Sequence, residues 1–168
     1  MAKTKTRPEP CTESSCHGRH SSEERIALAE SICARRGVQM TALRKRVLEM
    51  LWAGGGPTGA YQLIEAIKIE DSRPVGPPTV YRALEFLITQ GFVAKVESLN
   101  AYIPCAHPER DHDCLFFICN ACQASVELED SRIGKLLAED AASLGFAATR
   151  RTVEVEGMCA KCAEADAA

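Results

Sequence analysis

Two Cys-x-x-Cys pairs, Cys119–Cys122 and Cys159–Cys162, constrain the fold of this chain more than any other feature of its sequence. A pair with this spacing turns both thiolates toward one point, and two pairs supply the four sulfurs of a tetrahedral zinc site. The 36 residues between the pairs accommodate a strand, a helix and another strand. A single pair would leave a redox or disulfide role open, but two matched pairs in one short chain predict structural zinc that ties the end of a small domain to its middle.

The composition favours a cytoplasmic protein. No apolar run approaches the roughly 20 residues of a membrane span, and the polar start Met1–Lys5 has no apolar segment behind it that would form a secretory signal. Because disulfides are rare in the cytoplasm, the nine cysteines are interpreted as thiols and metal ligands. We therefore expect no membrane partner and no small-molecule substrate.

The charge is divided unevenly along the chain, although the net charge is only −3. Residues 1–97 carry 14 Lys and Arg against 11 Asp and Glu, whereas residues 98–168 carry 6 against 12. A nucleic-acid partner, if the protein has one, is therefore expected on the first half of the chain.

The predicted fold class is α+β, with three parts. Residues 1–22 are polar and are expected to form a disordered tail. Residues 23–97 predict a winged helix-turn-helix domain, because short capped helices beginning near Ser21, Thr41, Thr58 and Thr79 are followed by a β-hairpin over 92–97 and 100–103. Residues 98–168 predict a small α/β domain that carries the four cysteines and offers an apolar face for a homodimer.

The last helix of a winged helix-turn-helix enters the major groove of double-stranded DNA with its N-terminal residues toward the base edges. Arg82 is suited to a bidentate pair with guanine, and Tyr81 to a phosphate or a thymine methyl group. An ordinary solvated charged face is the alternative. The full set of candidate DNA contacts is Tyr61, Thr79, Tyr81 and Arg82, with Arg44, Lys45, Arg46 and Lys95 as candidate phosphate contacts.

A second group of metal-ligand residues surrounds the first cysteine pair. Its members are Cys105, His107, His112, Cys114 and Glu127. A mixture of thiolate, imidazole and carboxylate suits zinc, and the thiolate argues against Mg²⁺ or Ca²⁺. The mixed set predicts a regulatory zinc site whose occupancy follows metal supply, with a polar loop of incidental cysteines and histidines as the alternative.

The tail contains a further cluster of potential ligands. It consists of Cys11, Cys16, His17 and His20. Two interpretations remain open, a flexible tail that takes up metal weakly and an additional sensing or metal-delivery arm.

The chain resembles the ferric uptake regulator family, and within it the bacterial zinc uptake regulators, over about residues 25–164. The resemblance rests on four segments, Pro77–Leu84, Gly91–Ser98, Phe117–Cys122 and Gly157–Cys162. It implies a dimeric regulator that binds a palindromic operator when loaded with about two zinc ions per chain and represses zinc uptake genes. It also implies structural zinc on Cys119, Cys122, Cys159 and Cys162, regulatory zinc on Cys105, His112 and Glu127, and DNA contacts at Tyr61 and Arg82.

One position departs from the pattern of that family. Ala94 stands in the wing where zinc sensors of the family usually have a His or Asp, and a methyl group cannot bind metal. His107 or Cys114 is then the candidate fourth ligand, with Glu97 or solvent as alternatives. An iron-responsive or thiol-oxidation regulator of the same family is the alternative function. Enzymatic activity is not expected, because no catalytic motif such as His-Glu-x-x-His is present.

Overall fold

The structure is a computed structural model, and it describes residues 10–11, 21–70, 75–109, 114–128, 130–148 and 151–166. The chain forms two compact units that divide between residues 110 and 111, and the first strand joins the second unit. The first unit therefore extends beyond residue 97, where the sequence suggested a boundary. Within the described ranges, no helix has the length and apolar character needed to cross a membrane.

The first two helices begin at the caps that the sequence predicts. Ser21 caps α1 (Ser22–Arg35) through a capping box with Glu24, which satisfies two backbone N–H groups that a helix start leaves without partners. The Thr41 hydroxyl caps α2 (Ala42–Gly54) by accepting from the Arg44 N–H. Both helices turn their apolar residues into one buried core, as the 3.6-residue period requires.

The third helix begins later than predicted. Thr58–Gly59 forms a short strand, β2, and α3 (Ala60–Glu70) starts only after it. The later start results from tertiary pairing, because Thr58 pairs with Tyr102 and Gly59 with Ala101 on a strand much later in the sequence.

The helix α4 (Pro77–Thr89) also differs at its start from the prediction. Gly76, not Thr79, is its N-cap, and the two prolines occupy the first turn. Proline is favoured there because it has no N–H to satisfy and its φ is already helical. Val80, Leu84 and Leu87 are buried, so one face of α4 is fixed against the core.

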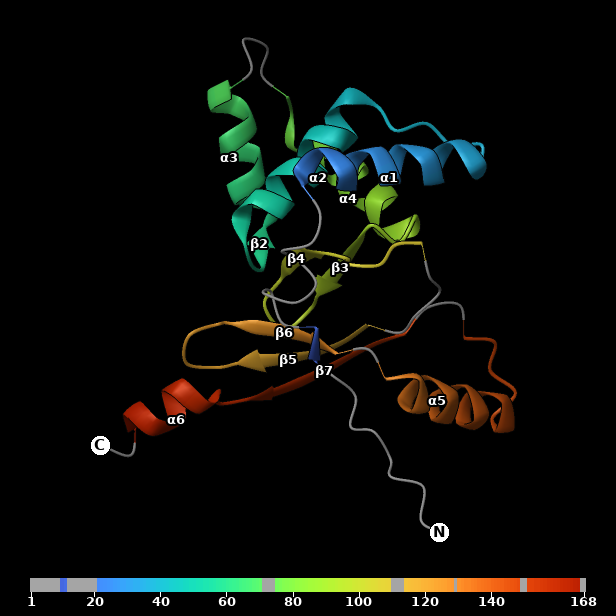
Figure 1. The fold of residues 1–168 in the computed structure, drawn as a ribbon, viewed down its shortest axis with the longest axis vertical. Coiled ribbons are helices and arrows are strands. Elements are labelled where there is room, and N and C mark those ends of the chain that lie inside the picture. Colours follow the sequence, from blue (N-terminus) through green and yellow to red (C-terminus); the bar gives the residue numbers. More distant parts are fainter. Residues whose placement is uncertain are drawn as a thin grey trace. The chain divides into compact units, whose positions relative to one another are not determined.

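The wing is the antiparallel pair β3 (Val93–Val96) and β4 (Ala101–Pro104), drawn as adjacent arrows in Figure 1. Asn100 closes the turn between them with a φ of 46°, a left-handed conformation that asparagine tolerates better than most residues. The sheet order is β2-β4-β3. The predicted β-hairpin over 92–97 and 100–103 is therefore confirmed, and Tyr102 and Ile103 belong to the wing although they lie beyond the predicted domain boundary at residue 97.

The second unit is built on a four-stranded sheet in the order β1-β6-β5-β7. Its strands are β1 (Pro10–Cys11), β5 (Cys114–Cys119), β6 (Ser125–Leu128) and β7 (Thr152–Gly157). β5 runs antiparallel to β6 and parallel to β7 (Figure 1). The strand β1 lies within the tail that the sequence predicts to be disordered, and the rest of that tail lies outside the described residues.

Two helices complete this unit, α5 (Ser131–Ser143) and α6 (Ala160–Asp166). Asp130 caps α5 by accepting a hydrogen bond from the Arg132 backbone N–H. Apolar side chains of this helix and its C-cap are exposed in the single chain, since Leu136 is 58% exposed and Leu144 is 82% exposed. A large apolar surface of this kind is typical of a region that contacts another molecule.

Candidate metal centre and nucleic-acid interface

The sheet of the second unit brings the two cysteine pairs together. Cys119 ends β5, and Cys122 lies in the turn that leads to β6. In the parallel pairing of β5 with β7, Cys119 stands opposite Gly157, so the chain leaving β7 places Cys159 and Cys162 beside the first pair. A backbone hydrogen bond from the Asn120 N–H to the Gly157 carbonyl, 2.8 Å long, fixes this junction.

The four sulfurs have the spacing of a tetrahedral zinc site. The ligand atoms all lie within 4.8 Å of one another, and the Sγ atoms of Cys122 and Cys159 are 3.9 Å apart. Four sulfurs at about 2.3 Å from a central zinc ion are about 3.8 Å from one another. The residues therefore fit the zinc ion that the sequence predicts, and among the described residues they are the one group of three or more His, Cys, Asp or Glu close enough to hold a metal.

The surroundings of Cys119 and Cys162 shift the pKa values of these two thiols in opposite directions. The backbone N–H of Cys159 donates to Cys119 Sγ over 3.3 Å, and this and neighbouring N–H groups lower the pKa of Cys119 to about 6. Hydrogen bonds with the sulfurs of Cys159, Cys122 and Cys119 raise the pKa of Cys162 to about 12. A bound zinc ion supplies the positive charge that lets all four sulfurs be thiolates at once.

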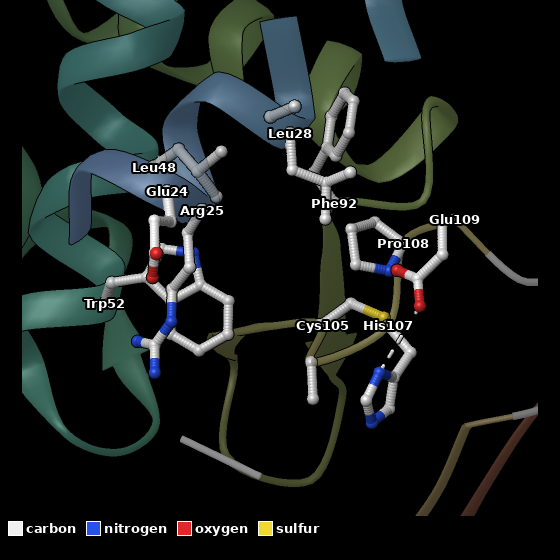
Figure 2. A pocket seen from close by; sticks show the side chains of 12 residues that line it. Glu24, Arg25, Leu28, Leu48, Trp52, Phe92, Cys105, His107, Pro108 and Glu109 are labelled. Atoms are coloured by element: carbon white, nitrogen blue, oxygen red, sulfur yellow. Dashed lines mark ion pairs between the residues drawn. The ribbon is translucent and has the colours of Figure 1, made fainter. Parts of the chain in front are cut away.

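Two residues of the predicted regulatory site lie in the first unit. Cys105 follows β4, is buried, and donates its backbone N–H to the Phe92 carbonyl at 2.9 Å. His107 pairs through Nδ1 with Glu109 Oε1 at 3.4 Å. Cys105 and His107 line one pocket of about 210 Å³ between α1, α2 and the segment after β4, where Arg25 stacks on the indole ring of Trp52 (Figure 2).

The remaining predicted ligands are placed only in part. Glu127 is a buried carboxylate on β6, 7% exposed, and its backbone stands opposite Cys11 of β1. Ala94 is buried within β3. Only the backbone is described for Cys11 and Cys114, and His112, Cys16, His17 and His20 lie outside the described residues. The regulatory set therefore stays a prediction.

The candidate base-contacting residues share the exposed side of the helix-turn-helix. Tyr81 is 43% exposed and Arg82 is exposed on α4, while the buried side of the same helix is packed on the core. Thr79 lies one turn before Arg82 on the same helix and is also exposed. Tyr61, in the first turn of α3, is 74% exposed. These side chains are accessible and rest on rigid helices, which a base contact requires.

The candidate phosphate contacts already have partners within the chain. Lys45 pairs with Glu30 of α1 at 3.2 Å, Arg46 pairs with Glu49, and Lys95 pairs with Glu97. The guanidinium of Arg44 lies 3.5 Å from the centre of the Phe86 ring. No role was predicted for Phe86, although its position one turn after Arg82 on α4 was a usable signal.

Known proteins resemble this chain along most of its length. The sequence pattern of the ferric uptake regulator family matches residues 35–156. The zinc uptake regulation protein of Escherichia coli (strain K12) is 39% identical over 148 residues, which are 88% of this chain and 86% of that protein.

Two solved relatives resemble it in structure as well. A zinc uptake regulator complexed with zinc and DNA superposes with a TM-score of 0.81 at 38% identity, covering 89% of this chain and all of that chain. XcZur in its holo form gives a TM-score of 0.76 at 41% identity, covering 86% of this chain and 99% of that one. The apo form of XcZur gives 0.50 at 40% identity and covers 84% and 97%, so the two forms of that relative differ in conformation.

Proposed function

The chain belongs to the ferric uptake regulator family, and on this premise we propose that it is a zinc-responsive repressor. When its regulatory site holds zinc, a homodimer binds a palindromic operator in double-stranded DNA and represses genes for zinc uptake. It is a transcription regulator, not an enzyme, in agreement with the sequence-based expectation. The observation that carries the proposal is the exposed N-terminal half of α4 on a winged helix, in a chain that also brings four cysteine sulfurs together at the spacing of a zinc site.

In this proposal the four cysteines hold the structural zinc and a different set of residues senses metal. Thiolates hold zinc tightly and keep the second unit folded at ordinary zinc levels. The regulatory zinc is assigned to Cys105, His112 and Glu127, with His107 or Cys114 as the fourth ligand because Ala94 offers no donor atom. Burial of Cys105 and Glu127 supports this assignment, since water competes less for a metal bound by buried groups.

Homodimerisation is proposed through the second unit. Leu136, Leu144 and Phe146 are exposed apolar side chains on or just after α5, and Phe117 and Val155 are exposed on the sheet. Covering these side chains with a second copy removes them from water, which favours association by roughly 25 cal/mol per Å² of apolar surface. A two-fold dimer also explains why a palindromic operator is expected.

Zinc controls DNA binding in this proposal by stabilising one arrangement of the two winged helices. Both α4 helices of a dimer must reach successive major-groove faces together, so freedom of the winged helices weakens binding. Zinc shifts the equilibrium toward the DNA-binding arrangement because it binds this arrangement more tightly than the other one. By thermodynamic linkage, bound DNA raises the affinity for zinc by the same factor by which zinc raises the affinity for DNA. The different conformations of apo and holo XcZur support a metal-dependent change of this kind.

The test is a binding titration with an operator duplex that the zinc-loaded protein selects from a random-sequence library. Free Zn²⁺ is buffered, Fe²⁺ and Mn²⁺ serve as controls, and salt is held constant because phosphate contacts make the affinity salt-dependent. We expect tight binding only with zinc, and a loss of this zinc dependence in Cys105→Ser. Cys33→Ser is the matched control, because Cys33 is a buried cysteine of the same unit within the apolar core.

The competing outcomes are distinct. A Cys105→Ser variant that keeps the wild-type zinc dependence contradicts the regulatory assignment. Binding that ignores zinc but responds to Fe²⁺ or to peroxide identifies the iron- or redox-responsive alternative. In either case the winged helix and the four-cysteine centre are unaffected.

A further inference from the structure

We propose that Arg44 positions the DNA-reading helix α4 through Phe86 and is not a phosphate contact. The inference rests on the proposed DNA-binding function and assigns a role within it to two residues. The sequence alone suggested the Arg44 guanidinium group as a partner of the DNA backbone.

The Arg44 guanidinium is held from two directions. Its Cζ atom lies 3.5 Å from the centre of the Phe86 ring, well within the distance at which a cation is attracted to an aromatic face. Its NH1 group donates a hydrogen bond to the carbonyl oxygen of Gln39, just before α2. Arg44 is partly buried as a residue, and a phosphate contact would require its guanidinium group to leave these two favourable interactions.

The contact with Phe86 joins α2 to α4 on the side that carries the candidate DNA contacts. Phe86 follows Arg82 by four residues, which places the two side chains as neighbours along one face of the helix. Successive residues of a helix are about 100° apart around its axis. A small rotation of α4 therefore displaces the long Arg82 side chain, and a fixed Phe86 ring opposes that rotation.

A second arginine holds the other end of α4. Arg36, which follows α1, donates from NH1 to the backbone carbonyl of Gln90, the C-cap residue of α4. The buried residues Val80, Leu84 and Leu87 attach the inner face of the helix to the core. Arg44 and Arg36 add contacts at two further points of the same helix, one at the Phe86 ring and one at its C-cap.

Positioning and phosphate contact predict different effects on DNA affinity. Loss of a phosphate contact weakens binding to all duplexes about equally and lowers the slope of log K against log[salt] by about 0.9. Loss of a positioning residue weakens binding to the selected operator and spares binding to unrelated DNA, because only the operator complex requires Arg82 at a defined base edge.

The experiment measures full-length zinc-loaded protein on two duplexes of equal length, the library-selected operator and a scrambled version of it, at several salt concentrations. The variants are Arg44→Ala, Arg44→Lys and Phe86→Leu. The control is Arg46→Ala, which removes the same charge two residues further along α2. The Arg46 side chain is exposed and pairs with Glu49 of the same helix.

We expect Arg44→Ala and Phe86→Leu each to lower operator affinity by about three- to thirtyfold, with little change on scrambled DNA and an unchanged salt slope. The double variant should lose little more than either single variant, because both remove the same contact. Arg44→Lys should recover only part of the affinity, since an ammonium group lacks the planar face that stacks on the ring. Arg46→Ala should weaken both duplexes by the same factor.

The proposal is overturned if Arg44→Ala weakens both duplexes equally, lowers the salt slope by about one and is rescued by Arg44→Lys. It is also overturned if Phe86→Leu leaves operator affinity unchanged. Hydrogen exchange without DNA provides an independent measurement, in which the amides of α4 should exchange faster in Arg44→Ala than in Arg46→Ala. If the wild-type protein selects no duplex, the DNA-binding function itself is refuted, and faster exchange would then report on helix anchoring alone.

Discussion

The Sγ atoms of Cys122 and Cys159 lie 3.9 Å apart although the two cysteines are 37 positions apart in the chain. Between them run β6, α5 and β7, so one metal ion closes a long loop that contains most of the second unit. Closing a long loop without a metal or covalent link has an entropic cost that this small sheet must offset by packing alone. The folding of the second unit is therefore expected to depend on zinc.

Replacing Cys159 with alanine should remove the tightly bound zinc and unfold the second unit. Structural zinc in small domains contributes about 10–16 kcal/mol near neutral pH, more than a unit of this size retains without it. Metal content per chain and limited proteolysis of the purified variant measure the two effects. Cys33→Ala is the control and should keep its zinc, and a folded Cys159→Ala protein with full zinc content would contradict the four-cysteine assignment.

Trp52, the single tryptophan of the chain, should report zinc binding at the regulatory site. It lines the same pocket as Cys105 and His107, so a metal bound by Cys105 changes the packing around the indole ring. We expect the Trp52 emission to change when zinc is added to protein whose four-cysteine site is already filled. The change should be absent in Cys105→Ser, and an identical response in that variant would place the metal elsewhere.

Leu87→Ala should lower the free energy of unfolding of the first unit by about 2–5 kcal/mol. The side chain is fully buried on the inner face of α4, and its removal leaves a cavity in the core. Urea unfolding monitored by Trp52 fluorescence measures the change. Ile69→Ala is the comparison, because Ile69 is largely exposed at the end of α3 and its loss should change stability by less than about 0.5 kcal/mol.

Asp130 should titrate with a midpoint near pH 2. Hydrogen bonds from the Arg132 side chain and its backbone N–H lower the pKa of the Asp130 carboxyl from 3.8 to about 2. Because the pKa in the folded state is below that in the unfolded state, the contribution of Asp130 to stability is present above about pH 4 and lost as the pH falls toward 2. A pH titration of this carboxyl by NMR measures the midpoint, which Arg132→Gln should move back toward 3.8.

The sequence predicted best the elements whose signals are local. Ser21 and Thr41, which the sequence places at helix starts, each accept a hydrogen bond from a backbone N–H there. The four cysteines were predicted from spacing alone, because a tetrahedral thiolate site allows few other arrangements of two such pairs.

Features that depend on distant partners were missed. The strand β2 exists because Thr58 meets Tyr102, and no window around Thr58 contains that information. The cap of α4 was misplaced although its signal is local: Thr79 was chosen because threonine is a frequent N-cap, whereas the adjacent proline pair favours an earlier start at Gly76. The stacking of Arg44 on Phe86 was not predicted, because the two residues are 42 positions apart in the sequence.

The pairing of β1 with β6 makes the second unit discontinuous in sequence, with the winged helix inserted between its first strand and the rest of its sheet. A truncation that starts at α1 would remove a strand of the neighbouring sheet and expose the backbone edge of β6, the strand that carries Glu127. Exposed strand edges promote aggregation. An excised C-terminal half should therefore be less soluble than the full chain, and grafting the winged helix onto another protein requires two junctions in the host sequence instead of one.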